Sequence, residues 1–383
     1  MLNGIKNNIH AMKFSMLEFS GGLGDLGTFI PLVAGISIVT GMDLGIILIF
    51  AGIFNILTGL LFGQPIPVQP MKAIAAVAIA EQLLPAEIAA AGLLAGAIVF
   101  VLGSSGLITK VEHLIPKSII RGIQLGVGLK LALKGISFIS EMPIIGLNSI
   151  TTALFIGVGI LILKKVNKFP TALLLFGSGL FILFLLTPEA LLQINVSLPS
   201  FHFIIPSSEN WLTGLTRGAL PQIPLTLLNS VFAVCILSGD LFPDKKISTG
   251  KMATSVGLMN LIGCGFGGLP MCHGSGGLAG QYHFGARTGG SVVILGVIKL
   301  LVGLFLGVSA MQLIQLYPLS ILGIMLIFAG YELARPARDQ KQLVGIIITI
   351  STALGIIFLN TLYGFLIGLL VYLIIKVSHL NKN

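Results

Sequence analysis

Long apolar stretches without charge alternate with short polar segments along the whole chain. Several stretches contain no Asp, Glu, Lys or Arg, among them 88–109, 142–163, 218–239, 252–286, 300–331 and 342–375. A helix needs about 20 apolar residues to cross a bilayer, so each stretch is long enough to span one. We therefore predict an all-α polytopic membrane protein, with 1–383 forming a single membrane transport domain.

Fourteen membrane segments fit between the polar connections. Their predicted bounds are 16–40, 43–63, 65–82, 86–109, 115–139, 146–164, 168–187, 213–240, 247–267, 268–288, 291–316, 318–335, 341–359 and 360–377. The polar stretch 188–212 divides them into a first repeat, 16–187, and a second repeat, 213–377. Because each half holds seven segments, the two halves are expected to be inverted relative to each other.

Two segments, the third and the tenth, are interrupted by Pro and Gly. The first reads PIPVQPMK at 65–72 and the second GLPMCHGSGG at 268–277, and an offset of 203 aligns Pro67 with Pro270 and Lys72 with Ser275. Such paired breaks in the two halves of a transporter allow half-helices to begin near the membrane midplane. We predict two extended pieces that pair with each other, each followed by a half-helix.

The charge at these half-helices favours a small anion with two negative charges. A helix N-terminus carries roughly +0.5 charge, so two facing ones supply about +1. Lys72 adds another positive charge at the start of the first half-helix, and a lone charge within a membrane segment is costly and usually functional. Backbone N–H groups near 71–74 and 273–277 are the expected hydrogen-bond donors.

Polar and small residues in the segments that face the centre complete the predicted site. The candidate substrate-binding residues are Gln69, Met71, Lys72, Ala73, Gln222, His273, Gly274, Ser275, Gly276 and Gln281. Asp25 is the most deeply placed carboxylate. Two roles remain open for Asp25: it neutralises Lys72, or it takes up a coupling proton.

The basic residues lie in loops that fall on one side if there are fourteen segments. By the positive-inside rule both termini are then cytoplasmic, and we expect the cell (plasma) membrane. The net charge of +9 therefore reports topology and lipid contact rather than nucleic-acid binding.

Several other classes of function lack support in the sequence. The chain has no Walker motif G-x-x-x-x-G-K-[ST], no pair of intramembrane carboxylates and no CxxC pair, and His273 stands where the G-x-S-x-G turn of a hydrolase needs glycine. We predict no enzyme activity, no cofactor and no metal. A nucleobase or bicarbonate carrier of the same fold and a passive anion channel remain as alternatives.

Four blocks of sequence carry a resemblance to a known family. They are GDLGT at 24–28, PVQPMK at 67–72, PQIPLT at 221–226, and PMCHGSGGLAGQY with FGART across 270–288. Over essentially its whole length the chain resembles the molybdate/sulfate transporter family, in the molybdate branch related to the sulfate permeases.

The resemblance implies a core of segments 1–4 and 8–11 that moves against a gate of segments 5–7 and 12–14 in an elevator-like manner. It also implies secondary active uptake of molybdate first and sulfate second, between half-helices 3 and 10. Relatives of this fold are often homodimers. Unlike the sulfate permeases, this chain is expected to have no C-terminal STAS domain.

Overall fold

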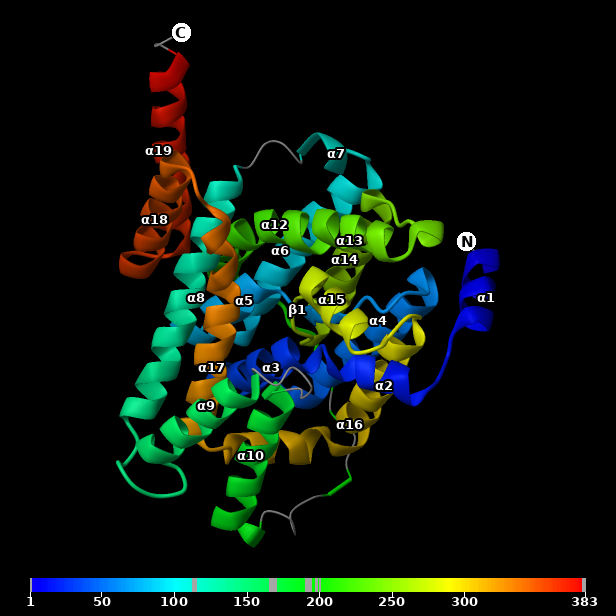
Figure 1. The fold of residues 1–383 in the computed structure, drawn as a ribbon, viewed down its shortest axis with the longest axis vertical. Coiled ribbons are helices and arrows are strands. Elements are labelled where there is room, and N and C mark those ends of the chain that lie inside the picture. Colours follow the sequence, from blue (N-terminus) through cyan, green and yellow to red (C-terminus); the bar gives the residue numbers. More distant parts are fainter. Residues whose placement is uncertain are drawn as a thin grey trace.

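The computed structural model describes residues 2–111, 116–164, 171–189, 195, 196, 199 and 201–380. These residues form helices joined by short connections, with two short strands at the centre (Figure 1). In the first half the elements are α1 Leu2–Ala11, α2 Met16–Leu23, α3 Leu26–Thr40, α4 Leu44–Phe62, β1 Val68–Pro70, α5 Lys72–Glu81, α6 Pro85–Ser104, α7 Ile108–Val111, α8 Lys117–Ser140, α9 Ile150–Lys164 and α10 Thr171–Leu186.

The second half begins with a long helix that contains two π-helical stretches. Its parts are α11 Ser208–Thr213, η2 Gly214–Ala219, α12 Leu220–Leu225, η3 Thr226–Phe232 and α13 Ala233–Leu241. The elements that follow are η4 Pro243–Lys245, α14 Thr249–Gly263, η5 Cys264–Phe266, β2 Met271–His273, α15 Ser275–His283, α16 Gly290–Gln315, α17 Leu319–Ala334, η6 Arg335–Asp339, α18 Leu343–Phe358 and α19 Thr361–Leu380.

Within the described residues, six helices are long and apolar enough to cross a membrane. They are Leu44–Phe62, Pro85–Ser104, Lys117–Ser140, Ser208–Leu241, Gly290–Gln315 and Leu319–Asp339. Shorter apolar helices accompany them at Phe29–Thr40, Ile150–Ile162, Leu174–Leu186, Leu343–Phe358 and Thr361–Val377. The all-α membrane fold is thus confirmed, while the number of fourteen crossings stays a prediction.

The bounds of the elements differ from the predicted segments in two informative places. The first segment is split by a turn at Gly24 and Asp25 into α2 and α3. The helix of the eighth segment begins at Ser208, inside the polar stretch that we assigned to the linker. Ser207 explains this early start, because its side chain accepts from the Asn210 N–H while the Asn210 side chain accepts from the Ser207 N–H.

The two breaks meet as an antiparallel pair of strands. The register pairs Val68 with His273, Gln69 with Cys272 and Pro70 with Met271. Under the 203-residue offset, Val68 corresponds to Met271, Gln69 to Cys272 and Pro70 to His273. Exchanging the two strands under this offset therefore gives the same set of pairs, with Gln69–Cys272 at the centre. This symmetry confirms the predicted pairing and supports an inverted repeat.

Close helix pairs surround the strands. The α4 helix packs on α16, α6 on α14, and α8 on α17. Glycines set the spacing of these pairs. A Cβ added to Gly52 of α4 would lie 2.6 Å from the carbonyl oxygen of Gly296 in α16. A Cβ added to Gly128 of α8 would lie 2.6 Å from the carbonyl oxygen of Gly330 in α17.

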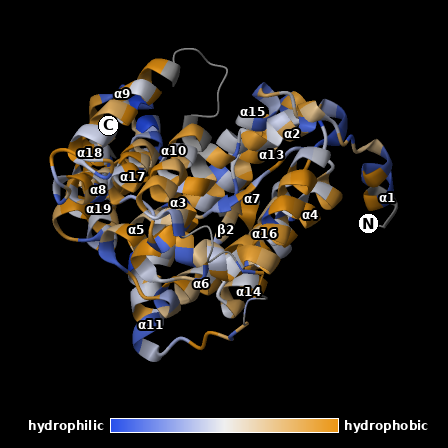
Figure 2. Cartoon of the chain, turned by 90° about the horizontal axis from the view of Figure 1, so that it is seen from below, coloured by the Kyte–Doolittle hydropathy of each residue, from blue (hydrophilic) through white to orange (hydrophobic). Residues whose placement is uncertain are grey.

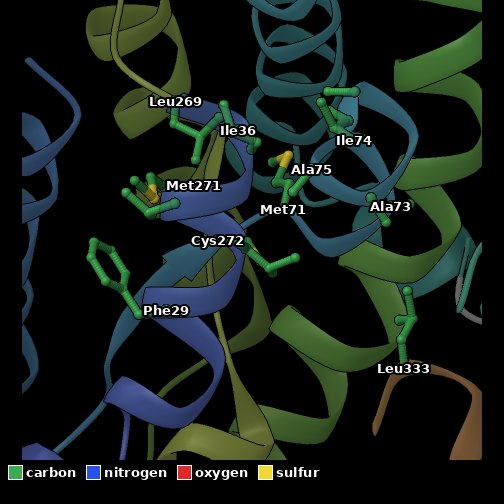
Figure 3. Packing of buried hydrophobic residues seen from close by; sticks show 14 of the residues in the cluster. Phe29, Ile36, Met71, Ala73, Ile74, Ala75, Leu269, Met271, Cys272 and Leu333 are labelled. Carbon is green, nitrogen blue, oxygen red and sulfur yellow. The ribbon is translucent and has the colours of Figure 1, made fainter. Parts of the chain in front are cut away.

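The buried centre and the outer faces are both apolar. Phe29, Ile36, Met71 and Met271 pack together where α3 passes the two strands (Figure 3). Hydrophobic residues also cover the outer helices (Figure 2), and Phe155 of α9 has 84% of its surface exposed. Such an outer surface is the one that lipid contact requires.

Candidate substrate site

Two asparagines anchor the strands at equivalent places in the two halves. Asn55 Oδ1 of α4 accepts a hydrogen bond of 2.9 Å from the Val68 N–H, and Asn260 Oδ1 of α14 accepts one of 2.8 Å from the Met271 N–H. Asn260 also donates through Nδ2 to the Met271 carbonyl at 2.7 Å. These bonds satisfy backbone groups that would otherwise be unpaired in the membrane interior. Our sequence reasoning missed both residues, although each is a lone amide in an apolar helix shortly before a break.

The first turn of α5 is closed by partners within the protein. The Met71 N–H donates to the Pro270 carbonyl at 2.8 Å. The Ala73 and Ile74 N–H groups donate to Gln222 Oε1 at 2.8 and 3.3 Å. Gln222 thus caps α5 from the helix α12, and three of the backbone donors that we assigned to an anion already have acceptors.

Lys72 is the first residue of α5 and is partly exposed. Among the residues that the structure describes, its side chain has no hydrogen bond and no ion pair. Asp25 does not pair with it at close range, in contrast to one of the two roles we considered for that carboxylate. Lys72 therefore presents a positive charge without a direct counter-ion at the N-terminal end of a half-helix.

The first turn of α15 is open. Gly274 precedes the helix, and the N–H groups of Ser275, Gly276 and Gly277 have no acceptor within the described part of the chain. Gly276 is exposed, and a Cβ placed there would meet nothing within 4 Å. Three backbone donors at a helix start that is accessible from outside are a suitable arrangement for oxyanion oxygens.

A polar cluster buried beside this turn joins three elements. Gln69 of β1 donates through Nε2 to Asp25 Oδ1. Lys299 of α16 has its Nζ 4.0 Å from Asp25 Oδ2 and 3.5 Å from the centre of the Phe29 ring, with only 4% of the side chain exposed. A Cβ at Gly277 would lie 2.9 Å from Asp25 Oδ1, so the cluster contacts the start of α15 directly.

The sequence did not place Lys299 beside Asp25. It contains no signal that this lysine faces Asp25 from a helix 274 positions later. The 4.0 Å separation is an ion pair without a direct hydrogen bond, and Asp25 Oδ2 and Lys299 Nζ are both buried with no hydrogen-bond partner among the residues that the structure describes.

The side chains of the two remaining polar candidates are engaged by residues outside the open turn. His273 is buried, with Nδ1 3.3 Å from the Pro67 carbonyl oxygen and Nε2 3.1 Å from Ser255 Oγ, so both ring nitrogens are engaged. Gln281 is about 9 Å further along α15 from Ser275 at 1.5 Å per residue, and its Oε1 accepts from Ser291 Oγ. Both positions favour a structural contribution over direct contact with substrate.

The described residues contain no group of three or more His, Cys, Asp or Glu side chains that could hold a metal ion. Cys235, Cys264 and Cys272 are free of disulfides. The chemistry that the site does offer is positive charge from Lys72 and hydrogen bonding from backbone N–H groups.

Two half-helices that start from a central pair of antiparallel strands, surrounded by apolar helices, give this membrane protein a fold of the solute carrier 26 type. The structure is similar to murine solute carrier 26 family member A9, an anion transporter, with a TM-score of 0.74, 14% identity, and coverage of 98% of this chain and 71% of that one. It is also similar to the transmembrane domain of the cyanobacterial bicarbonate transporter BicA, with a TM-score of 0.68, 18% identity, and coverage of 93% and 98%.

The sequence comparisons are more specific. The family model described as "Molybdate transporter of MFS superfamily" matches residues 17–131 and 214–333. Molybdate transporters 1 and 2 of Arabidopsis thaliana are 39% and 40% identical, over 100% and 95% of this chain and 92% and 88% of their own lengths. The chain belongs to this molybdate transporter family.

Proposed function

We propose that this protein is a secondary active transporter that takes up molybdate, with sulfate as the next candidate substrate. The names of the Arabidopsis relatives support molybdate as the substrate, and the positive charge of the site supports a substrate with negative charge. Asp25 and Lys299 offset each other, which leaves Lys72 and the two helix N-termini with a sum of about +2. That sum matches a tetrahedral dianion.

The observation that carries the proposal is that the positive charge of Lys72 and the open N–H groups of α15 occur in the same site. Lys72 has no direct counter-ion, and the N–H groups of 275–277 have no acceptor among the described residues. A neutral solute would gain little from this positive site. A nucleobase needs hydrogen-bonding side chains that match its ring, and no carboxylate is present in 218–239 or 252–286 to provide one.

Competition binding on the purified full-length protein tests the function. Molybdate, tungstate, sulfate, bicarbonate and uracil should be titrated against labelled molybdate. We expect the tetrahedral dianions to compete and uracil not to compete. Saturable counterflow in vesicles, without large conductance, would separate a carrier from a channel. Tight uracil or bicarbonate binding with no molybdate binding would refute the proposal.

Asp25 is our candidate for the coupling site. Three neighbours from different elements act on it: Gln69 of β1 by hydrogen bond, Lys299 of α16 by ion pairing, and Lys72 of α5 through its positive charge. Protonation of Asp25 would remove one negative charge from the site and so favour a dianion.

We therefore expect molybdate binding to the wild type to tighten as the pH falls. In an Asp25→Asn variant, binding should depend much less on pH, because the titrating group is gone. Equal pH dependence in the two proteins, measured by equilibrium binding at several pH values, would remove Asp25 from the coupling step while leaving the substrate assignment intact.

We further propose an elevator-like movement of the core against the gate. Lys130 of α8 and Glu81 at the end of α5 form an ion pair of 2.7 Å across this boundary, and a moving core has to break it. A short thiol cross-linker between cysteines at 81 and 130 should block uptake, and reduction should restore it when the linker is cleavable. Full uptake by the cross-linked protein would exclude the movement.

A further inference from the structure

A hollow of about 530 Å³ lies where the start of α8, the start of α18 and the end of α19 meet. None of its residues belongs to the candidate substrate site. Its lining consists of Lys117, Ser118, Gln340, Gln342, Val344, Gly345, Ile348, Tyr372, Ile375 and Lys376. In the predicted topology this is the side of the protein that carries the basic loops.

Two helices begin at this hollow without a side-chain cap. The α8 helix starts at Lys117 after Pro116, and α18 starts at Leu343 after Gln342. Within the described residues, no acceptor binds the N–H groups of 117, 118 or 343–345. Unpaired N–H groups and the positive ends of two helix dipoles both favour an anion here.

The side chains add positive charge. Lys117 Nζ lies 2.8 Å and Arg121 Nη2 2.7 Å from the same Asp339 carboxylate oxygen, so one acid is shared by two cations. Lys376 adds a third cation, with its Nζ 5.8 Å from the centre of the Tyr372 ring that lines the hollow. Three cations against one carboxylate leave a positive surplus.

Packing between α8 and α18 holds the hollow in shape. Thr349 Oγ1 of α18 donates to the Ser118 carbonyl at 3.0 Å. Gly345 allows the Gln340 side chain to lie close, since a Cβ at Gly345 would be 2.7 Å from Gln340 Oε1.

The surroundings of the hollow are apolar and exposed. Val344, Ile348 and Ile375 form part of its wall, and Leu343 and Ile374 beside it have 73% and 59% of their surfaces exposed. A free inorganic anion would contact only the lysines and the helix starts. A phospholipid would contact these and the apolar wall as well, with its phosphate among the N–H groups and lysines and its acyl chains along α18 and α19.

We propose that this hollow binds the phosphate of an anionic phospholipid headgroup. The recognition elements are the lysines at 117 and 376 and the two helix starts at 117 and 343. Their place on the basic side corresponds to the membrane leaflet in which anionic lipids attract basic residues.

The test uses full-length protein in detergent, supplemented with phosphatidylglycerol or with phosphatidylcholine of the same acyl chains. Retained lipid is counted by native mass spectrometry, and the thermal midpoint is measured in parallel. We expect the wild type to retain phosphatidylglycerol preferentially. Lys376→Gln should retain roughly fivefold less, and the Lys117→Gln/Lys376→Gln double variant less again.

Lys341→Gln is the matched control, because it removes a lysine from the same connection without touching the hollow. The control should behave as the wild type. Equal retention of the two lipids, or equal loss in the control, would overturn the proposal. Sodium phosphate alone identifies the source of the anion: lysine-dependent stabilisation by phosphate, with no preference for the lipid, would overturn a lipid site. Lys376→Gln leaves the Lys117–Asp339 ion pair intact, so it tests the site even if the double variant is unstable.

Discussion

The half-helices α5 and α15 begin at positions related by the same offset, Lys72 and Ser275, yet their first turns offer opposite chemistry. In α5 the donors of 73 and 74 are capped by Gln222, and a lysine supplies charge. In α15 the corresponding donors are open, and glycine replaces the alanine of α5, since Ala73 corresponds to Gly276. The backbone geometry is symmetric, and in the proposed site α5 supplies positive charge to the anion while α15 supplies hydrogen-bond donors.

This division follows from the cost of burying polar groups. An unpaired N–H in the membrane interior costs several kcal/mol, so every donor needs an acceptor from the protein, water or substrate. Gln222 provides that acceptor for α5. The accessible surface at Gly276 allows water or substrate to provide it for α15. The comparison thus predicts that the backbone donors of α5 are structural and that those of α15 bind the substrate.

The largest effect should come from the charge in α5. Lys72→Ala removes the cation at the start of α5, which has no ion pair among the described residues, and a hydrogen bond to a charged group contributes about 1.5–3 kcal/mol. We expect molybdate affinity to fall by roughly 10- to 100-fold by isothermal titration. Lys72→Arg keeps the charge and should retain much of the affinity. Wild-type affinity in Lys72→Ala would show that the charge of α5 does not act on the substrate.

Substitutions of Gln222 can separate the effect of capping the start of α5 from the effect of electrostatic charge near Lys72. Gln222→Glu preserves an acceptor for the Ala73 and Ile74 N–H groups but adds a negative charge near Lys72. At pH 8 we expect stability to be kept while molybdate affinity falls by roughly tenfold, because the new charge opposes the dianion.

Gln222→Met is the matched control for this effect. It removes the cap and should lower stability by about 1 kcal/mol, without the electrostatic loss of affinity. Thermal unfolding and titration of both variants measure the two quantities. If both variants lowered affinity equally, the cap rather than the local charge would control binding.

Sequence reasoning recovered the breaks well because Pro and Gly mark them directly. PIPVQPMK and GLPMCHGSGG were each expected to form an extended piece followed by a half-helix, and each does so. Lys72 and Ser275, which the 203-residue offset aligns, are the first residues of the two helices. Local signals of this kind need no tertiary information. The position of Lys72 at the first helical residue followed from the same pattern.

The partners of these residues could not be obtained in the same way. Gln222 reaches the start of α5 from 149 positions away, and Lys299 faces Asp25 across helices that the pattern does not place relative to each other. Whether a first turn is open depends on whether a side chain from elsewhere in the fold caps its N–H groups. Tertiary packing determines this, so the sequence pattern alone assigned hydrogen-bond donors to both turns equally.

The smallest expected loss of molybdate affinity comes from a substitution in the open first turn of α15. Gly276→Ala makes α15 resemble α5 at the corresponding position, and the added methyl meets nothing within 4 Å. Stability should be kept or rise by up to about 1 kcal/mol, because alanine favours a helix over glycine. Molybdate affinity should fall by roughly fivefold, since the methyl group lies among the donors of 275–277 and hinders approach of an oxyanion.

Gly277→Ala provides the contrast one residue later. Its Cβ would lie 2.5 Å from Pro67 Cγ and 2.6 Å from Gln69 Nε2, so this variant should lose folding stability. Paired thermal unfolding and titration of the two glycine variants therefore separate binding from packing within one turn. If Gly276→Ala bound molybdate as the wild type does, the donors at the start of α15 would not be the ones that hold the anion, and the two half-helices would differ in packing alone.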